Sequence, residues 1–497
     1  MQATQPIVLL FAISIWTAAC TGARSDPAAD SVTLRSIPAA VSISVLRSGS
    51  DSVIASPGHS YDAGWLRRLM AGDLHRELWR IPISVEVLRL DSFAGGLSLL
   101  GSSGGGQTPG LRMLGRDGIT YQFRAIMKNP RPSLPSALRR SPFTSMVHDQ
   151  MAAQFPLAPM VVAELAEDLG VLAVKPRLVV LPDDPRLGPF REMFAGRMGF
   201  MEIRPQEGPD ETPGFAGSTN VTDSDGLHAE LSANPYSYVD ERAMLRARLL
   251  DILVGDWDRH SDQWRWARYE DGHRLRWVPI PRDRDWAFPR VDGILRSIVR
   301  LLVPQYVGFG AKYPRISRLT RSGRNIDRAT LSRLGRADFM AAAREVAATL
   351  TDDVLRSALV VLPPQYRSAG DTILVALRSR RDNLTRAARD YYEVLARTPR
   401  IRGTSGADSV AIISDGRTVR VKLFSTDHDG LLLFDRTFLS EETRRVELDL
   451  VDGADHVVIT GAALPIKFRV STGAGGAQVV DRSGGKNIRV HARSAAD

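Results

Sequence analysis

Two acidic motifs joined by one short hairpin constrain the fold of this chain more than any other feature. Residues 250–288 read LDILVGDWDRHSDQWRWARYEDGHRLRWVPIPRDRDWAF. Asp258 and Gln263 belong to the first motif, and Asp283 follows the hairpin. The segment therefore predicts the end of a helix, an acidic loop, two short strands and a second acidic loop, in that order.

The helix before the first motif is predicted over residues 240–254. Leu245, Leu249 and Ile252 form its apolar stripe. Asp251 stands near its C-terminal end, and two interpretations of it are open: its carboxylate orients the following loop by hydrogen bonds, or it is an ordinary acid at a helix end.

These side chains are of the types that phosphoryl transfer from a metal-bound nucleotide requires. One carboxylate lies beside the acceptor hydroxyl, an amide or carboxylate follows about one turn later, and a second carboxylate holds Mg²⁺ against the phosphates. Asp258, with His260 of the same motif, is the candidate catalytic group. The candidate ligands of Mg²⁺ or Mn²⁺ are Gln263, Asp283 and Asp285. Either motif alone is more often a surface turn or a solvated loop, so the prediction depends on their order and spacing.

The two motifs resemble those of several kinase families. Asp258-Arg259-His260 is similar to the core of HipA-type toxin kinases, phosphoinositide kinases and secretory-pathway casein kinases. The segment DRDWAFP after the hairpin resembles the metal-binding segment of type II phosphatidylinositol 4-kinases, and GDWD with DRDWAF looks like the CotH-type spore-coat kinases. The resemblance implies an α+β, bilobal kinase-like domain that binds ATP. Most of those families have Asn where Gln263 stands, so this amide has a different reach.

A glycine run and two cations upstream fit the small lobe of such a domain. Residues 94–128 predict its first three strands, and Gly104, Gly105 and Gly106 would let backbone N–H groups approach phosphate oxygens. Arg124 stands where the resemblance places a phosphate-binding Lys, and Lys128 follows. Arg holds phosphates bidentately, so the exchange is not neutral. Both residues are equally well interpreted as surface cations.

The adenine ring is expected beside the strand that contains Met201, at the hinge between the lobes. Residues 205–235 are rich in Gly, Pro, Ser, Thr and Asn and predict a loop. Three acids on the predicted helices before that strand are candidates to pair with the strand cation, and the sequence does not choose among Asp149, Glu164 and Glu167.

The rest of the chain predicts a helical large lobe and a C-terminal β-domain. Helices are expected over 337–350, 353–362 and 371–396, and a helix over 64–79 has Trp65, Leu66 and Leu69 spaced as a buried stripe. After residue 400, short alternating runs predict a small antiparallel β-sandwich. We expect the following parts: 1–20 signal peptide, 21–36 tether, 37–204 N-terminal segment and small lobe, 205–400 helical large lobe, 401–497 β-sandwich.

The N-terminus resembles a bacterial lipoprotein signal. Residues 7–19 are apolar but too few to span a bilayer, and they end in Thr-Ala-Ala before Cys20, the one cysteine of the chain. The resemblance implies a lipidated Cys20 that anchors the protein in the envelope, in the outer membrane by the usual sorting rule. An ordinary secretory signal is the alternative. From residue 55 on, segments such as GWLRRLMAGDLHRELW and YQFRAI resemble a group of bacterial envelope proteins, some of which carry an outer-membrane β-barrel.

Two functions are compatible with these observations. The first is an atypical kinase that uses Mg-nucleotide to phosphorylate or adenylylate an unidentified hydroxyl acceptor. The second is a non-catalytic kinase-like module that binds a ligand or an outer-membrane partner such as a barrel protein. The formal net charge is +9, yet no basic run is interleaved with aromatics, which argues against nucleic acid as a partner. No Walker-type, nucleophile-elbow or His-Glu-x-x-His motif is present.

Overall fold

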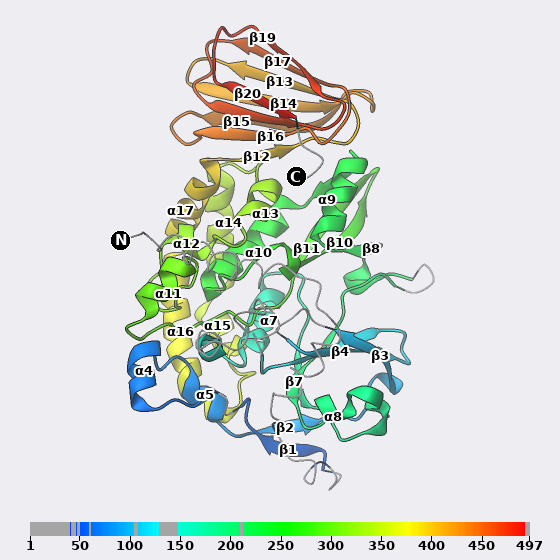
Figure 1. Ribbon diagram of the computed structural model, residues 1–497, viewed down its shortest axis with the longest axis vertical. Helices are drawn as coiled ribbons and strands as arrows, with labels where there is room; N and C mark the ends of the chain where they lie inside the picture. The colour runs from blue at the N-terminus through cyan, green and yellow to red at the C-terminus, as the bar shows by residue number, and fades with distance from the viewer. Residues whose placement is uncertain are drawn as a thin grey trace, which may run out of the picture.

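The fold has three parts that follow one another along the long axis of the molecule (Figure 1). A sheet-rich small lobe lies at one end, a helical lobe in the middle and a β-domain at the other end, which confirms the predicted α+β class. The structure is a computed structural model that describes residues 40, 46, 50–58, 61–103, 108–128, 148–208 and 212–492. The signal, tether and Cys20, and the run Gly104–Gly106, lie outside the described residues.

The small lobe is built on one seven-stranded sheet in the order β1-β2-β6-β7-β5-β4-β3. Every neighbouring pair is antiparallel except β2 with β6. The strands predicted over 94–128 are confirmed as β3, β4 and β5. The bounds are β1 (Ser52–Ala55), β2 (Ile83–Val87), β3 (Leu97–Ser103), β4 (Gly110–Gly115), β5 (Thr120–Ala125), β6 (Arg177–Val180) and β7 (Met198–Ile203).

The two faces of this sheet have different roles. Arg124 on β5 lies opposite Phe200 on β7, so both side chains point to the face that meets the helical lobe. Phe123 and Met201 form the next opposed pair, and they are buried in a separate hydrophobic cluster on the other face. Helix α7 (Ala158–Asp168) covers the first face, and α8 (Arg191–Phe194) belongs to the second.

The helix predicted over 64–79 is two helices, α4 (Trp65–Ala71) and α5 (Arg76–Arg80). Gly72 separates them with φ of 105°, a backbone conformation that ends a helix. The prediction of a buried stripe is wrong, because Trp65 is 77% exposed and its two apolar neighbours are also exposed. The segment before α11 (Arg296–Leu302) bonds to the backbone of α4, where the amide of the exposed Ile294 donates to the Leu69 carbonyl at 3.3 Å.

The segment predicted as a loop over 205–235 contains regular structure. Strand β8 (Asn220–Thr222) joins a four-stranded sheet in the order β8-β10-β11-β9, and helix α9 (Ser224–Ala233) follows it. The Asp223 side chain caps α9 by accepting a hydrogen bond from the Gly226 amide at 2.9 Å, and Leu227 is fully buried. The polar composition of residues 205–235 predicted a loop, but the cap at Asp223 and the burial of Leu227 stabilise a helix. The other strands are β9 (Ser237–Val239), β10 (Trp264–Asp271) and β11 (Arg274–Pro281).

The helical lobe surrounds α10 (Glu241–Val254), the helix predicted before the first motif. The Asp240 side chain caps its first turn, and the Thr351 side chain caps α15. The helix predicted over 371–396 is interrupted at Asn383, which separates α16 from α17. The remaining bounds are α12 (Ile316–Leu319), α13 (Arg324–Thr330), α14 (Arg336–Thr349), α15 (Asp352–Ala358), α16 (Arg367–Asp382) and α17 (Leu384–Ala396).

The C-terminal domain is a two-sheet sandwich, and from β15 to β20 successive strands alternate between the sheets. The order of one sheet is β12-β16-β18-β20 and of the other β15-β14-β13-β17-β19. Antiparallel pairing is confined to β13, β14 and β15, and every other neighbouring pair runs parallel. The bounds are β12 (Arg400–Arg402), β13 (Asp408–Ser414), β14 (Thr418–Ser425), β15 (Leu431–Leu439), β16 (Arg445–Asp449), β17 (Asp455–Gly461), β18 (Lys467–Thr472), β19 (Ala477–Asp481) and β20 (Ile488–Ala492).

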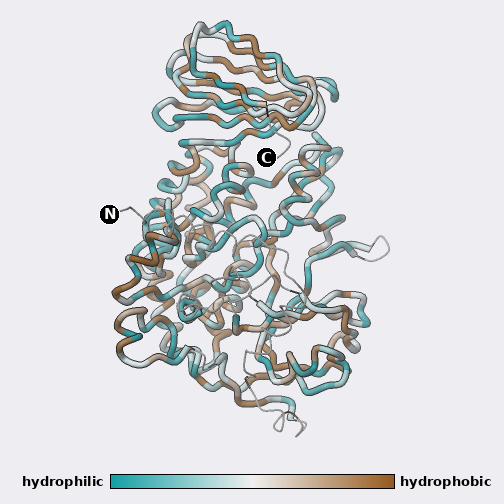
Figure 2. The backbone as a smooth tube through the Cα atoms, in the orientation of Figure 1, coloured by the Kyte–Doolittle hydropathy of each residue, from teal (hydrophilic) through white to brown (hydrophobic). Residues whose placement is uncertain are grey.

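Hydrophobic residues fill the space between these two sheets, and hydropathy alternates along their strands (Figure 2). The parallel pairing stacks two similar segments: Gly406-Ala407-Asp408 leads into β13, and Gly453-Ala454-Asp455 leads into the neighbouring β17. The Asp408 amide donates a hydrogen bond to the Asp455 carboxylate at 3.0 Å. Short alternating runs predicted the strands, but they did not predict that most neighbouring strands pair in parallel.

Within the part of the chain that the structure describes, no helix has the length and apolar character needed to cross a membrane.

Candidate functional site

The first acidic motif lies in a loop held against the end of α10. Gly255 ends the helix in the left-handed conformation, with φ of 77°. The Asp256 amide then donates to the Asp251 carbonyl at 2.9 Å, and the Asp258 amide donates to the Asp256 carboxylate at 3.1 Å. Asp258 is thereby fixed at the edge of the loop by contacts within the loop and helix.

Asp251 lies at the centre of a buried cluster of charged side chains. Its carboxylate contacts Arg248 at 2.8 Å, Arg259 at 3.2 Å and Arg284 at 3.0 Å. Arg248 also binds Asp327 of α13 at 2.8 Å. Because these groups are almost wholly buried, each carboxylate needs its guanidinium partners to remain charged. The interpretation of Asp251 as the residue that orients the loop agrees with this geometry.

Arg259, the middle residue of Asp-Arg-His, connects the two motifs. Its backbone amide donates to the Ser322 hydroxyl at 3.0 Å, and its guanidinium donates to the Arg282 carbonyl at 2.5 Å. The same guanidinium lies over the Trp264 ring, with 4.7 Å between its central carbon and the ring centroid. Arg259 is a positioning residue, since it holds the second acidic loop against the first.

The second acidic loop leaves β11 with an unusual backbone. Asp283 has φ of 56° and Phe288 has φ of 56°, although neither is glycine. The Arg282 amide donates to the Gln263 carbonyl at 2.8 Å, and the Phe288 amide donates to the Val254 carbonyl at 2.9 Å. The first motif holds one end of the loop and α10 holds the other. Contacts of this kind are needed to keep non-glycine residues at positive φ.

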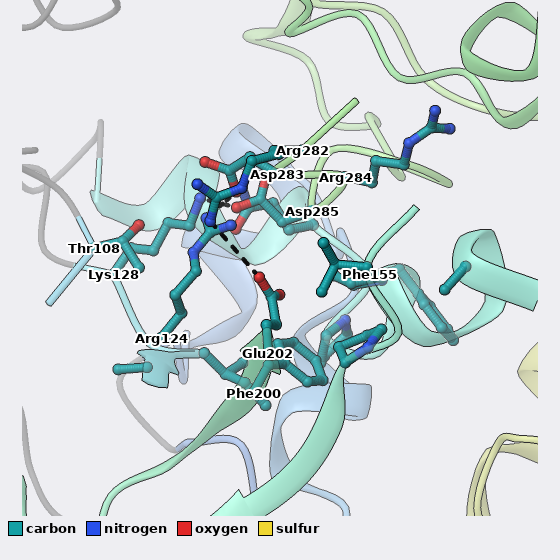
Figure 3. Close-up of a pocket in the computed structure, with 18 of the residues that line it drawn as sticks. Thr108, Arg124, Lys128, Phe155, Phe200, Glu202, Arg282, Asp283, Arg284 and Asp285 are labelled. Atoms are coloured by element: carbon teal, nitrogen blue, oxygen red, sulfur yellow. Dashed lines mark hydrogen bonds and ion pairs between the residues drawn. The ribbon is translucent and has the colours of Figure 1, made fainter. Parts of the chain in front are cut away.

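The cations of the small lobe meet the acids of this loop. Arg124 of β5 forms an ion pair with Asp283, and Lys128 just beyond that strand forms one with Asp285. Figure 3 shows the four side chains converging from the sheet and from the loop. Sequence positions far apart are thus brought together as the resemblance implied, although the cations contact the metal-binding candidates and not a helical acid.

A cavity of about 60 Å³ adjoins these pairs, between β5, β7 and α7. The side chains of Phe155 and Phe200 line it together with Glu202, which approaches Arg282 at 3.9 Å (Figure 3). This volume is below the 300–1,000 Å³ typical of small-molecule sites. A nucleotide would therefore need the loop and the sheet to separate.

The charges around the cavity set the carboxyl pKa values apart. Burial raises the pKa of Asp283, but the nearby Arg124 and Lys128 outweigh burial and hold it well below its usual range. Burial and the charge of Asp283 raise the pKa of Asp285 to about 7. Burial also raises the pKa of Asp258, against the opposing effect of His260 and Lys128. One carboxylate stays ionised at neutral pH, and its neighbour shares a proton with it.

The structure brings most of the predicted site residues together. His260 Nε2 lies 4.0 Å from Asp258 Oδ1 and 3.3 Å from the Gln263 side-chain nitrogen. Met201 is the exception, because its side chain is buried in the cluster on the far face of the sheet and does not line the cavity. A contact between adenine and the backbone of β7 stays a prediction.

None of the three acids proposed to pair with the strand cation does so. Asp149 binds Arg76 through two hydrogen bonds of 2.6 Å, and Glu164 and Glu167 both pair with Lys175 at the surface. The prediction is wrong because Arg76 of α5, which is 1% exposed, needs the buried carboxylate of Asp149.

Two site residues were missed by the sequence analysis. Glu202 was noticed only as part of a strand, and its position opposite Gln122, on the same face as Arg124, requires the β5–β7 register. Arg282 precedes Asp283 and donates to the Gln122 side chain at 3.1 Å. The one available signal for Glu202 was a single acid in the otherwise apolar strand β7, and it pointed to no particular partner.

The oxygen-rich character of the loop fits a hard divalent cation. Asp283 and Asp285 are neighbouring carboxylates, and the Gln263 backbone bonds the start of the same loop. Among the described residues, however, no three His, Cys, Asp or Glu side chains are already grouped as a metal site. The residues that would hold Mg²⁺ or Mn²⁺ are therefore Asp283 and Asp285, once their ion pairs open.

Comparisons with known proteins give partial structural likeness only. No family model matches the chain, and no curated protein matches it. The kinase CtkA of Helicobacter pylori is 10% identical, and the match covers 59% of this chain and 95% of that one with a TM-score of 0.34. HipA of Shewanella oneidensis is 12% identical, with coverage of 59% and 67% and a TM-score of 0.28. Rio2 kinase of Chaetomium thermophilum, solved with ADP/Mg²⁺ and phosphoaspartate, is 12% identical, with coverage of 78% and 94% and a TM-score of 0.25.

Proposed function

We propose that this protein is an atypical phosphotransferase that uses a nucleotide with Mg²⁺ or Mn²⁺. The observation that carries the proposal is the convergence of Asp283 and Asp285 with Arg124 and Lys128 at one cavity. A scaffold gains nothing from two neighbouring carboxylates in a cleft, whereas phosphoryl transfer needs oxygen ligands and phosphate-binding cations side by side.

Each residue has a role in this proposal. Arg124 and Lys128 bind phosphate oxygens, while Asp283 and Asp285 hold the divalent cation, which supplies charge neutralisation at the phosphates when bound. Asp258, with its raised pKa, accepts the proton of the acceptor hydroxyl. Because Asp258 lies in the electrostatic reach of both Lys128 and Asp283, the acceptor and the phosphates would share one site.

The proposal is tested by nucleotide binding to the purified chain. We expect ATP with Mg²⁺ or Mn²⁺ to raise the melting temperature. At a ligand concentration one hundred times Kd, the free energy of unfolding should increase by about 2.7 kcal/mol. Asp283→Ala should abolish this shift. Asp371→Ala, which removes an exposed acid of α16, is the matched control and should retain it. A shift that persists in Asp283→Ala would contradict the assigned metal site.

A non-catalytic ligand-binding module is the second candidate. The small cavity favours it, as does the fact that the candidate metal ligands are already paired with cations. The two candidates differ in whether they transfer a phosphate group. Incorporation of radiolabel from the γ-phosphate or the α-phosphate into an envelope extract, if it is lost in Asp258→Asn, supports the transferase. Nucleotide binding without any transfer supports the binding module.

The envelope location is proposed on the sequence alone. A lipidated Cys20 would tether the kinase-like domain to a membrane, beside a partner such as a barrel protein. Mass spectrometry of the mature N-terminus tests this, with a diacylglyceryl-modified Cys20 as the expected result. An unmodified N-terminus beyond residue 20 would support an ordinary secretory signal instead.

A further inference from the structure

A second cavity, lined by no residue of the acidic loops, lies where the helical lobe meets the C-terminal domain. Its volume is about 440 Å³, within the range of small-molecule sites. Six of its nine lining residues are cations and none is acidic. The cations come from separate segments of the chain: Arg324 and Arg328 from α13, Arg397 after α17, Arg444 and Arg445 at the start of β16, and Lys467 at the start of β18.

The backbone fixes this arrangement. The amides of Arg444 and Arg445 donate to the Arg397 carbonyl at 3.1 and 3.3 Å, and the Lys467 amide donates to the Arg444 carbonyl at 3.2 Å. Backbone hydrogen bonds therefore hold four of the six cations, Arg397, Arg444, Arg445 and Lys467, next to one another. Like charges held together in this way destabilise the protein unless an anion compensates them.

Compensation from the protein is slight. Within the described residues, none of the six cations belongs to an ion pair, and the nearby Glu447 is bound by Arg400 at 3.3 Å. Burial lowers the pKa of Arg324 and of Arg328. Neighbouring arginines lower both further, against the opposing effect of Asp327 on both and of Glu447 on Arg328. The Nε atoms of these two side chains are buried and make no hydrogen bond to the protein. Buried donors of this kind need a partner, which a bound anion would supply.

We propose that this cavity, defined by the six cations, binds a compact polyanion that carries two or more phosphate groups. Guanidinium groups match phosphate oxygens in planar, bidentate geometry, and six positive charges exceed what one phosphate neutralises. The proposal is independent of the nucleotide site, because the acidic loops contribute no residue to this cavity. The phosphate groups belong either to a free polyanion or to lipid headgroups.

The first test is calorimetric titration of the full-length protein with tripolyphosphate in buffer that contains a metal chelator. We expect binding at least tenfold tighter than that of inorganic phosphate, weakening as salt rises. Arg445→Gln should weaken it at least tenfold. Arg489→Gln, which removes an exposed cation of β20 in the same domain, and Asp283→Ala should leave it unchanged. Equal binding by the Arg445 and Arg489 variants would overturn the proposal.

A second readout does not depend on the ligand. Because Arg445 is exposed and surrounded by like charges, Arg445→Gln should raise the melting temperature of the free protein while reducing its shift with tripolyphosphate. A lowered melting temperature in the free variant would contradict the proposed repulsion.

The last test distinguishes the sources of phosphate. If lipid headgroups are the ligand, the protein should sediment with vesicles rich in anionic phospholipid and not with neutral vesicles. Tripolyphosphate should then release the protein from the anionic vesicles. Tripolyphosphate binding without vesicle binding supports a free polyanion. Displacement of tripolyphosphate by single-stranded nucleic acid at equal phosphate concentration would overturn the assignment to a compact ligand.

Discussion

Arg124 and Asp283 form an ion pair although 159 residues separate them in the sequence. The pair joins the sheet of the small lobe to the loop after β11, and in the proposed site these two side chains are the phosphate ligand and the metal ligand. The same side chains thus close the site in the absence of ligand and would bind the two halves of a metal-nucleotide complex in its presence.

Replacing Arg124 by Gln should change the binding of metal and of nucleotide in opposite directions. Asp283 loses its cation, so Mn²⁺ alone should bind about tenfold more tightly, which corresponds to about 1.4 kcal/mol. ATP should bind more weakly, since a phosphate contact is lost. Electron paramagnetic resonance of Mn²⁺ measures the first effect, and calorimetry the second. Arg116→Gln, an exposed cation of the same lobe, is the control, and a parallel change in both affinities would contradict the shared role.

Binding of metal-nucleotide should depend on pH through Asp285. Its folded pKa is raised to about 7, so below that value a proton competes with the metal ion. The affinity for Mn²⁺ with ATP should rise by up to about tenfold per pH unit below 7 and level off above it. In Asp285→Asn the overall affinity should be lower and the slope absent. A slope that survives in the variant would assign the titration to another group.

The buried charge cluster under the first motif should be costly to interrupt. Arg248→Met removes the buried guanidinium partner of Asp327 and one of the three that contact Asp251, and we expect the free energy of unfolding to fall by about 3–5 kcal/mol. Arg386→Met on the exposed face of α17 is the matched control, expected within about 0.5 kcal/mol of the parent. Urea unfolding followed by circular dichroism gives both values. Similar losses in the two variants would show that the cluster has no special role.

The β-domain should lose stability as pH rises. Burial and the neighbouring Asp408 raise the pKa of Asp455 to about 7, above its value in the unfolded chain. The folded state therefore binds more protons between the two pKa values, and the free energy of unfolding falls as pH rises from about 4 to 7. Asp455→Asn keeps the oxygen that accepts from the Asp408 amide and should remove this slope, with a gain of at least about 1 kcal/mol at pH 8. Melting curves from pH 4 to 8 test it, and a variant less stable at pH 8 would contradict the assignment.

Local signals predicted the parts of the site that local physics decides. The apolar stripe predicted α10, and a short hairpin was predicted between the two acidic motifs, so Asp258 and Asp283 were placed correctly in loops at its two ends. These features depend on residues close in sequence, where helix and hairpin rules operate.

The sequence did not predict which distant segments contact one another. The partner of Arg124 was sought on a helix, because nothing local shows that Asp149 is needed by Arg76. The exposure of Trp65 had the same cause: helical spacing shows that apolar residues share a face, but not whether another element covers that face. In the β-domain, alternation identified strands, while the parallel pairing of β13 with β17 depends on how successive turns stack.

The aromatic side chains around the first motif make the site observable by its own emission. Trp257 and Trp286 lie with ring centroids 4.5 Å apart, one on each acidic loop, so any movement of the second loop away from the small-lobe sheet changes the surroundings of both indoles. Trp65 is the exposed tryptophan of the described residues, and replacing it by Phe removes the solvent-exposed signal among them. In that variant, intrinsic fluorescence would follow opening and closing of the cleft in real time, without a label and without knowledge of the acceptor.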